Sequence, residues 1–138
     1  MDDHNLGVDQ ILEKGNAGET YNIGGNNEST NIDIVKTICN LIHQRVSRNK
    51  DLLKRYPNCT SANGSHPQTL VTHVTDRLGH DRRYAINAEK ISSGLGYSPA
   101  ESFETGIRKT LEWFLDKEDW WRQIVGGSYS NWIAVNYD

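Results

Sequence analysis

The chain has 138 residues, of which 36% are hydrophobic and 24% charged, and its net charge is −3. This composition is typical of a globular domain, and the acidic balance argues against a general nucleic-acid-binding surface, which is normally basic. No apolar run approaches the ~18 residues of a membrane-spanning helix, and the polar N-terminus does not have the pattern of a signal peptide. We therefore expect a cytoplasmic protein with neither a membrane nor a nucleic-acid partner.

The cysteine and histidine positions predict no metal centre. Cys39 and Cys59 lack the spacing of a disulfide framework or a zinc site, and the histidines are scattered along the chain. We expect both cysteines to be free thiols in a reducing compartment.

The first third of the chain predicts two helices separated by a short strand. Residues 3–14 have apolar side chains at helical spacing, and Gly15 can end this helix. Residues 20–23 are typical of a strand, which the double glycine at 24–25 ends. Thr30 is a good N-cap for a second amphipathic helix that reaches Val46.

The middle of the chain predicts an irregular segment and two more strands. Residues 47–68 are rich in polar side chains, so we expect a surface excursion with one helical turn around Leu52 and Leu53. Residues 69–75 alternate between apolar and polar side chains, which favours a strand, and residues 83–86 indicate a third short strand.

The last third predicts two helices. Asn87 can cap a short helix through Leu95, and Ser102 can cap a longer one that runs to about Val125. Five apolar residues of the longer helix are expected to face inward: Phe103, Ile107, Leu111, Phe114 and Leu115. With about three strands the chain cannot form a self-contained doubly wound sheet. We therefore expect one partial α/β domain over residues 1–138, composed mostly of helices.

A charged run at residues 75–86, TDRLGHDRRYAI, is the most informative motif, because six of its twelve residues are Asp, Arg or His. Arginine guanidinium groups beside a Gly-His turn are suited to binding phosphate with two aimed hydrogen bonds. The alternative is a surface loop with internal salt bridges, in which Asp76 pairs with Arg77 and Asp81 pairs with Arg82 or Arg83.

Together these motifs make the chain resemble a known family. The matches include GETYNIGG at 18–25, GHDRRYAI at 79–86 and FETGIRKT at 103–110. The sequence is similar to the C-terminal, substrate-binding part of the dTDP-glucose 4,6-dehydratases, which are nucleotide-sugar enzymes of the extended short-chain dehydrogenase/reductase group. It departs from them at Leu78, where the family usually has proline, and in residues 47–68.

The resemblance implies an extended Rossmann-type fold, a homodimer, and a reaction that converts dTDP-glucose to dTDP-4-keto-6-deoxyglucose and water with tightly held NAD. It assigns Arg77 to a phosphate or nucleotide contact, and His80 and Asp76 to the shape of the loop. Tyr129 either closes over the nucleotide or is a packing aromatic residue. The substrate-binding residues that it implies are Asn31, Asp76, Arg77, Leu78, Gly79, His80 and Tyr129.

The parts of the family that carry out the chemistry have no counterpart in this sequence. It contains no Gly-x-Gly-x-x-Gly fingerprint for a dinucleotide and no Tyr followed four residues later by Lys. The family's adjacent Asp-Glu pair is also expected in the missing dinucleotide-binding half. We therefore expect no catalytic or NAD-binding residue in this chain, and no activity from the chain alone.

Two alternatives remain open at this point. The chain could be a non-catalytic nucleotide-sugar-binding remnant, or the docking partner of a separately encoded cofactor half. It could also be the equivalent half of a nucleotide-sugar epimerase or decarboxylase, although the Asp-Arg-x-Gly-His run at 76–80 favours the dehydratase.

Overall fold

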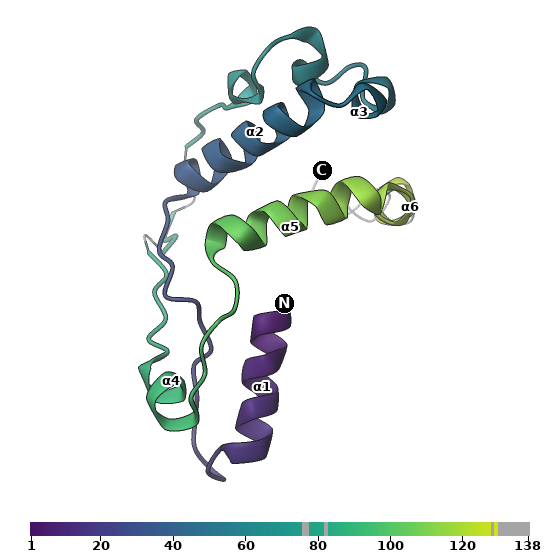
Figure 1. Ribbon diagram of the computed structural model, residues 1–138. Helices are drawn as coiled ribbons and strands as arrows, with labels where there is room; N and C mark the ends of the chain where they lie inside the picture. The colour runs from purple at the N-terminus through teal and green to yellow at the C-terminus, as the bar shows by residue number, and fades with distance from the viewer. Residues whose placement is uncertain (76–77, 82, 128, 130–138) are drawn as a thin grey trace.

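The structure is a computed structural model that describes residues 1–75, 78–81, 83–127 and 129. Its described residues form six α-helices and two 3₁₀ helices, arranged in two lobes (Figure 1). In chain order they are α1 (Asp2–Lys14), α2 (Asn31–Ser47), α3 (Lys50–Arg55), η1 (Thr60–Asn63), η2 (Pro67–Leu70), α4 (Glu89–Leu95), α5 (Phe103–Asp116) and α6 (Glu118–Gly126). No helix in the described part is both long and apolar enough to cross a membrane.

The smaller lobe consists of α1 and α4, which contact each other. Its core comprises Ala88, Ile91 and Tyr97, which are almost completely buried, and partly buried apolar side chains of α1 and the 21–23 segment pack around them. Gly7 allows the close approach of α1, because a Cβ atom there would lie 2.9 Å from Ile23 Cγ2. The segment after α4 is tied to α1, since Ala100 N and Glu101 N donate to the Asp3 carboxylate at 2.9 and 3.1 Å.

The larger lobe is built around α2, which contacts α3, η1, η2 and α5. The predicted caps are present: Asp33 N donates to Thr30 Oγ1 at the start of α2, and Thr105 N donates to Ser102 Oγ at the start of α5. The expected helical turn at Leu52 is confirmed as α3, and Leu52 is buried. The 47–68 segment thus holds α3, η1 and the start of η2, and packs on α2 instead of looping away from it.

The three predicted strands are absent from the described residues, which corrects the expected α/β content. A strand exists only through backbone pairing with a neighbour, and residues 20–23 and 83–86 have no such pairing. Residues 69 and 70 belong to η2 because Pro67 begins a 3₁₀ turn, and Thr69 Oγ1 donates to the carbonyl of His66 at 2.8 Å.

The long C-terminal helix that the sequence predicts is broken at Lys117, which separates α5 from α6. Two side chains bond the carbonyl groups freed at the end of α5. Trp121 Nε1 donates to Phe114 O at 2.8 Å, and Arg55 Nη2 donates to Leu115 O at 2.8 Å. These contacts satisfy backbone acceptors that would otherwise continue the helical ladder.

Candidate functional site

Residues 78–81 of the charged run form an exposed turn between the two lobes (Figure 1). Gly79 has φ of +75°, a left-handed conformation that suits a residue without a side chain. Leu78 and His80 are fully or largely exposed on either side of it. Asp76 and Arg77 lie outside the described residues, as does Arg82. A hydrogen bond to Asp81 raises the pKa of the Tyr84 phenol, so the run also bonds within itself.

An ion pair joins the run to the segment that precedes α2. Arg83 Nε and Nη2 lie 2.7 and 2.5 Å from Glu28 Oε2. Both side chains are largely exposed, so the pair contributes little to stability. The pair instead fixes the position of the charged run. Glu28 lies three residues before Asn31, so its bond to Arg83 keeps the run near the start of α2 (Figure 1). The alternative pairing of Asp81 with Arg83 is not formed.

The segment before α2 and the segment that leads from the charged run into α4 also lie side by side beyond the Glu28–Arg83 pair. The two segments run in opposite directions. Asn22 Nδ2 donates to Asn87 O at 3.3 Å, and Lys90 Nζ donates to Thr20 O at 2.7 Å. Lys90 also pairs with Glu19 at 2.7 Å and thereby lowers the pKa of that carboxyl. Side chains therefore hold these extended segments together, in place of the backbone bonds of a sheet.

The structure brings together some of the predicted site residues and separates another. Asn31 is the exposed first residue of α2, and the Glu28–Arg83 pair links its segment to the Leu78–Asp81 turn. Tyr129 is half-exposed and follows α6, whereas the turn lies by the opposite end of α5 (Figure 1). The proposed closure of Tyr129 over a nucleotide therefore stays a prediction.

A large hollow lies between the lobes, with a volume of about 780 Å³. It is open to residues of both lobes: Met1, Asp2, Asp3, His4, Ile23, Gly24, Gly25, Asn27, Tyr97, Pro99, Glu101, Ser102, Phe103, Gly106, Lys109, Thr110, Trp113 and Phe114. Within it, Lys109 pairs with Glu101. Hydrogen bonds from Ala100 N and Glu101 N lower the pKa of Asp3. Sequence reasoning missed this hollow, because residues nearly a hundred positions apart meet there.

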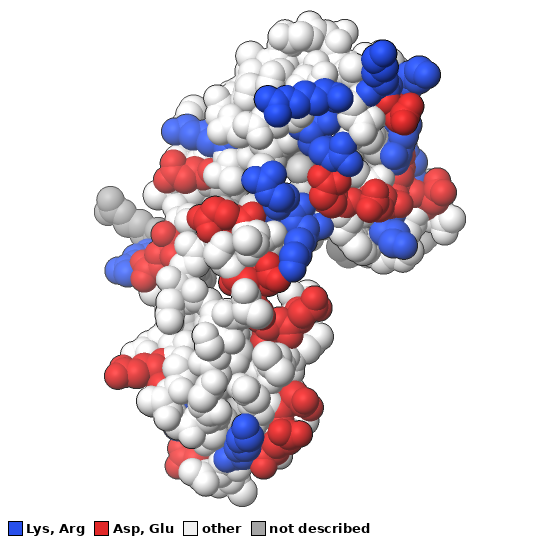
Figure 2. Space-filling view, viewed as in Figure 1, with Lys and Arg blue, Asp and Glu red and all other residues white. Residues whose placement is uncertain are grey.

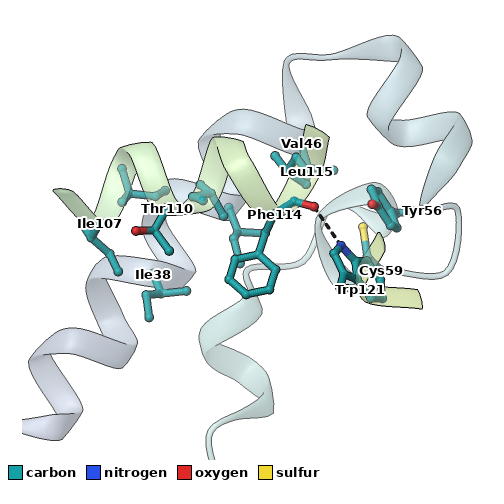
Figure 3. Close-up of a pocket in the computed structure, with 12 residues that line it drawn as sticks. Ile38, Val46, Tyr56, Cys59, Ile107, Thr110, Phe114, Leu115 and Trp121 are labelled. Atoms are coloured by element: carbon teal, nitrogen blue, oxygen red, sulfur yellow. Dashed lines mark hydrogen bonds between the residues drawn. The ribbon is translucent and has the colours of Figure 1, made fainter. Parts of the chain in front are cut away.

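A second hollow, an apolar groove of about 450 Å³, lies between α2 and α5 (Figure 3). Residues of α2, α5 and α6 line it together with Tyr56 and Cys59. Four of the five residues predicted to face inward from α5 line this groove, namely Ile107, Leu111, Phe114 and Leu115. Phe103 instead lines the hollow between the lobes. None of the five is buried, and Phe114 is 47% exposed.

The chain's residues do not fit a dinucleotide cofactor. The sequence lacks the Gly-rich fingerprint, and the described residues contain no strand that leads into a helix N-terminus, which is where such a fold binds the pyrophosphate. No group of three or more His, Cys, Asp or Glu in the described part could hold a metal ion.

Comparison with known proteins shows where this arrangement belongs. The family model of GDP-mannose 4,6 dehydratase matches residues 1–110. The chain belongs to the GDP-mannose 4,6 dehydratase family. This assignment and the relatives below confirm the resemblance inferred from the motifs.

Relatives in this family match the chain from end to end. It is 44% identical to the dTDP-glucose 4,6-dehydratase of Shigella flexneri and to dTDP-glucose 4,6-dehydratase 1 of Escherichia coli K12, each over 138 residues. It is 45% identical to the enzyme of Salmonella typhimurium LT2 over the same length. The chain spans 34% of the length of these relatives.

A solved structure of the family has the same fold in this region. The dTDP-glucose 4,6-dehydratase of Bacillus anthracis, solved in complex with NAD, matches 88% of the chain with 38% identity and a TM-score of 0.66. The match covers 31% of that structure's chain. The Rossmann-type enzyme predicted from the motifs is therefore the right structural relative, even though the strands predicted within this chain are not formed.

Proposed function

We propose that the chain is the nucleotide-sugar-binding part of a dTDP-glucose 4,6-dehydratase. One observation carries this proposal: enzymes of that name match all 138 residues at 44% identity, although the chain spans only 34% of their length. The substrate would be dTDP-glucose, and the product of the whole enzyme would be its 4-keto-6-deoxy derivative.

The proposed site lies where the charged run meets the start of α2. Following the family resemblance, the proposal assigns the phosphate or nucleotide contact to Arg77, while Arg83 is engaged by Glu28 at 2.5 Å. Asn31 would donate its amide to the nucleotide sugar, while Asp76, Leu78, Gly79 and His80 would shape the loop. Guanidinium groups bind phosphate with paired hydrogen bonds, which is why a single arginine can orient the ligand.

The cofactor and the catalytic groups would come from elsewhere. NAD supplies the transient oxidation in this chemistry when bound, and the residues of this chain do not fit it. The proposal therefore includes a dinucleotide-binding portion as a partner, a homodimeric whole enzyme in the cytoplasm, and no turnover by the chain alone. The alternative of a non-catalytic binding remnant shares the same ligand, so binding and turnover must be measured separately.

An amide NMR titration of the 138-residue chain with dTDP-glucose tests the proposed site. We expect shifts at Gly79, His80 and Asn31, and loss of those shifts in Arg77→Ala. Lys50→Ala is the matched control, because it removes one positive charge from α3 and should bind normally. GDP-mannose, the sugar nucleotide named by the family model, should bind more weakly. Unchanged spectra of a folded chain, or equal shifts in both variants, would refute the assignment.

A turnover assay distinguishes an active chain, a two-part enzyme and a non-catalytic remnant. Keto-sugar formed by the chain with NAD and dTDP-glucose would contradict the predicted lack of activity. Keto-sugar formed only after addition of a dinucleotide-binding portion from a relative would support the two-part enzyme. Binding without turnover under both conditions would favour the non-catalytic remnant.

A further inference from the structure

A third hollow, of about 310 Å³, lies between the C-terminal half of α2 and the middle of α5. We call it the arginine pocket, and its lining residues are Leu41, Gln44, Arg45, Arg48, Asn49, Arg108, Leu111 and Glu112. Its volume falls near the lower end of the range for small-molecule sites. None of the residues assigned to the nucleotide-sugar site lines it.

Three guanidinium groups and one carboxylate give the pocket an excess of positive charge. Arg45 Nε donates to both Glu112 oxygens, at 2.8 and 3.0 Å, so this pair is locally neutral. The guanidinium groups of Arg48 and Arg108 have no ion pair or hydrogen bond with any other described residue. Two uncompensated cations therefore face one small hollow in a chain whose net charge is −3.

The other polar groups of the pocket add mainly hydrogen-bond donors. Asn49 Oδ1 accepts from Asp51 N and Leu52 N at 2.9 and 3.0 Å, which leaves the amide nitrogen as its free donor. The Glu112 oxygens are engaged by Arg45. Leu41 and Leu111 supply an apolar lining between the charges. Figure 2 shows Lys and Arg side chains over the lobe of α2, α3 and α5, interspersed with Asp and Glu side chains.

We propose that the arginine pocket binds the phosphate or diphosphate group of a small molecule between Arg48 and Arg108. Each guanidinium presents a fork of donors that matches the oxygens of a phosphate. The Arg45–Glu112 pair links α2 to α5 beside the two free arginines. This site is independent of the proposed nucleotide-sugar site and would persist if that assignment failed.

Isothermal titration of the 138-residue chain with inorganic pyrophosphate tests the proposal. Because charge-assisted hydrogen bonds between guanidinium and phosphate are strong, we expect the double variant Arg48→Gln/Arg108→Gln to bind at least ~10-fold more weakly. Lys50→Gln/Lys54→Gln is the matched control: it removes two positive charges from α3, outside the pocket, and should bind normally. Circular dichroism checks that each variant is folded.

Three outcomes would overturn the proposal: no binding by the unmodified chain, equal losses in both double variants, or loss only in Arg77→Gln. The last result would place the anion at the nucleotide-sugar site instead. Glucose 1-phosphate, measured beside pyrophosphate, identifies the source of the phosphate group. If binding depends on Arg48 and Arg108, the site is supported whichever probe binds more tightly. Tighter binding of glucose 1-phosphate assigns the site to an organic phosphate, and tighter binding of pyrophosphate assigns it to an inorganic one.

Discussion

At the scale of single residues, Glu118 is the most strongly perturbed carboxylate in the part of the chain that the structure describes. Arg55 Nη2 and Arg122 Nε each lie 2.5 Å from one of its oxygens. Hydrogen bonds from Arg55, Tyr56 and Arg122 hold its pKa at about 2, well below the ordinary value of 4.5. The cluster joins α3 to the first turn of α6, so one ionised side chain links two helices that are far apart in the sequence.

We predict that this carboxylate makes the chain sensitive to acid. A carboxyl group whose pKa is lowered by folding stabilises the folded state above its unfolded pKa, and the benefit is lost as the pH falls. The loss should therefore occur between pH 4.5 and about 2. Glu118→Gln should unfold at lower urea concentration at neutral pH and lose less stability across this window. Glu13→Gln, on the exposed face of α1, is the control, and an unchanged acid profile in Glu118→Gln would contradict the prediction.

Only part of the candidate site could be predicted from the sequence at the level of single residues. The charged run is visible as a motif, and its Gly-His turn is confirmed by the positive φ of Gly79. The partner of Arg83 could not be predicted, because Glu28 lies 55 positions away whereas Asp81 is two positions away. Opposite charges near each other in sequence suggest local pairs, and only the packing of the two extended segments reveals the distant one.

At the scale of elements, the corner between α5 and α6 depends on tertiary contacts. The apolar pattern continues through Lys117, with Trp113, Trp120 and Trp121 at helical spacing, so the sequence predicts one helix. The break is stabilised by Arg55 from α3 and by the indole of Trp121, both of which bond carbonyl groups at the end of α5. Local periodicity carries no information about such distant donors.

We expect Trp121→Phe to destabilise the chain by about 1 kcal/mol, the typical net value of one hydrogen bond. Phenylalanine keeps an aromatic side chain in the groove and removes the donor to Phe114 O. Urea unfolding measures the change. Trp120→Phe is the control, since Trp120 contacts Trp113 ring to ring at 5.2 Å and is 55% exposed. Equal destabilisation by the two variants would show that the hydrogen bond does not matter.

Helices were more predictable than strands for a physical reason. Thr30 and Ser102 cap their own helices, and Gly96 ends α4 with φ of +75°, so these signals act within a few residues. Residues 20–23 have strand-like side chains, but a strand needs a neighbouring backbone, and here Lys90 Nζ occupies the Thr20 carbonyl. The sequence indicates an extended conformation without indicating its partner.

At the scale of the whole molecule, the chain exposes more surface than a compact protein of its size. Its accessible area is 10978 Å². A compact monomer of 15.6 kDa should expose only about 7,200 Å². Large apolar side chains contribute to the excess, among them Phe114 at 47% and Trp113 at 42% exposure.

We predict that the isolated chain associates with itself as its concentration rises, because exposed apolar surface is removed from water on contact. Sedimentation velocity over a range of concentrations should show an increasing average mass. Addition of a dinucleotide-binding portion from a relative should compete with this association if the proposed two-part enzyme is correct. A single monomeric species at all concentrations would contradict the prediction.

The two lobes have a consequence for how the protein can be divided. The smaller lobe takes α1 and α4, and the larger takes α2, α3, η1 and η2 together with α5 and α6, so the chain crosses between the lobes three times. Neither lobe is one uninterrupted stretch of the gene. Removing the residues of one lobe would therefore cut the other, and a single protease nick in the segment between η2 and α4 would leave both lobes holding pieces of two peptides.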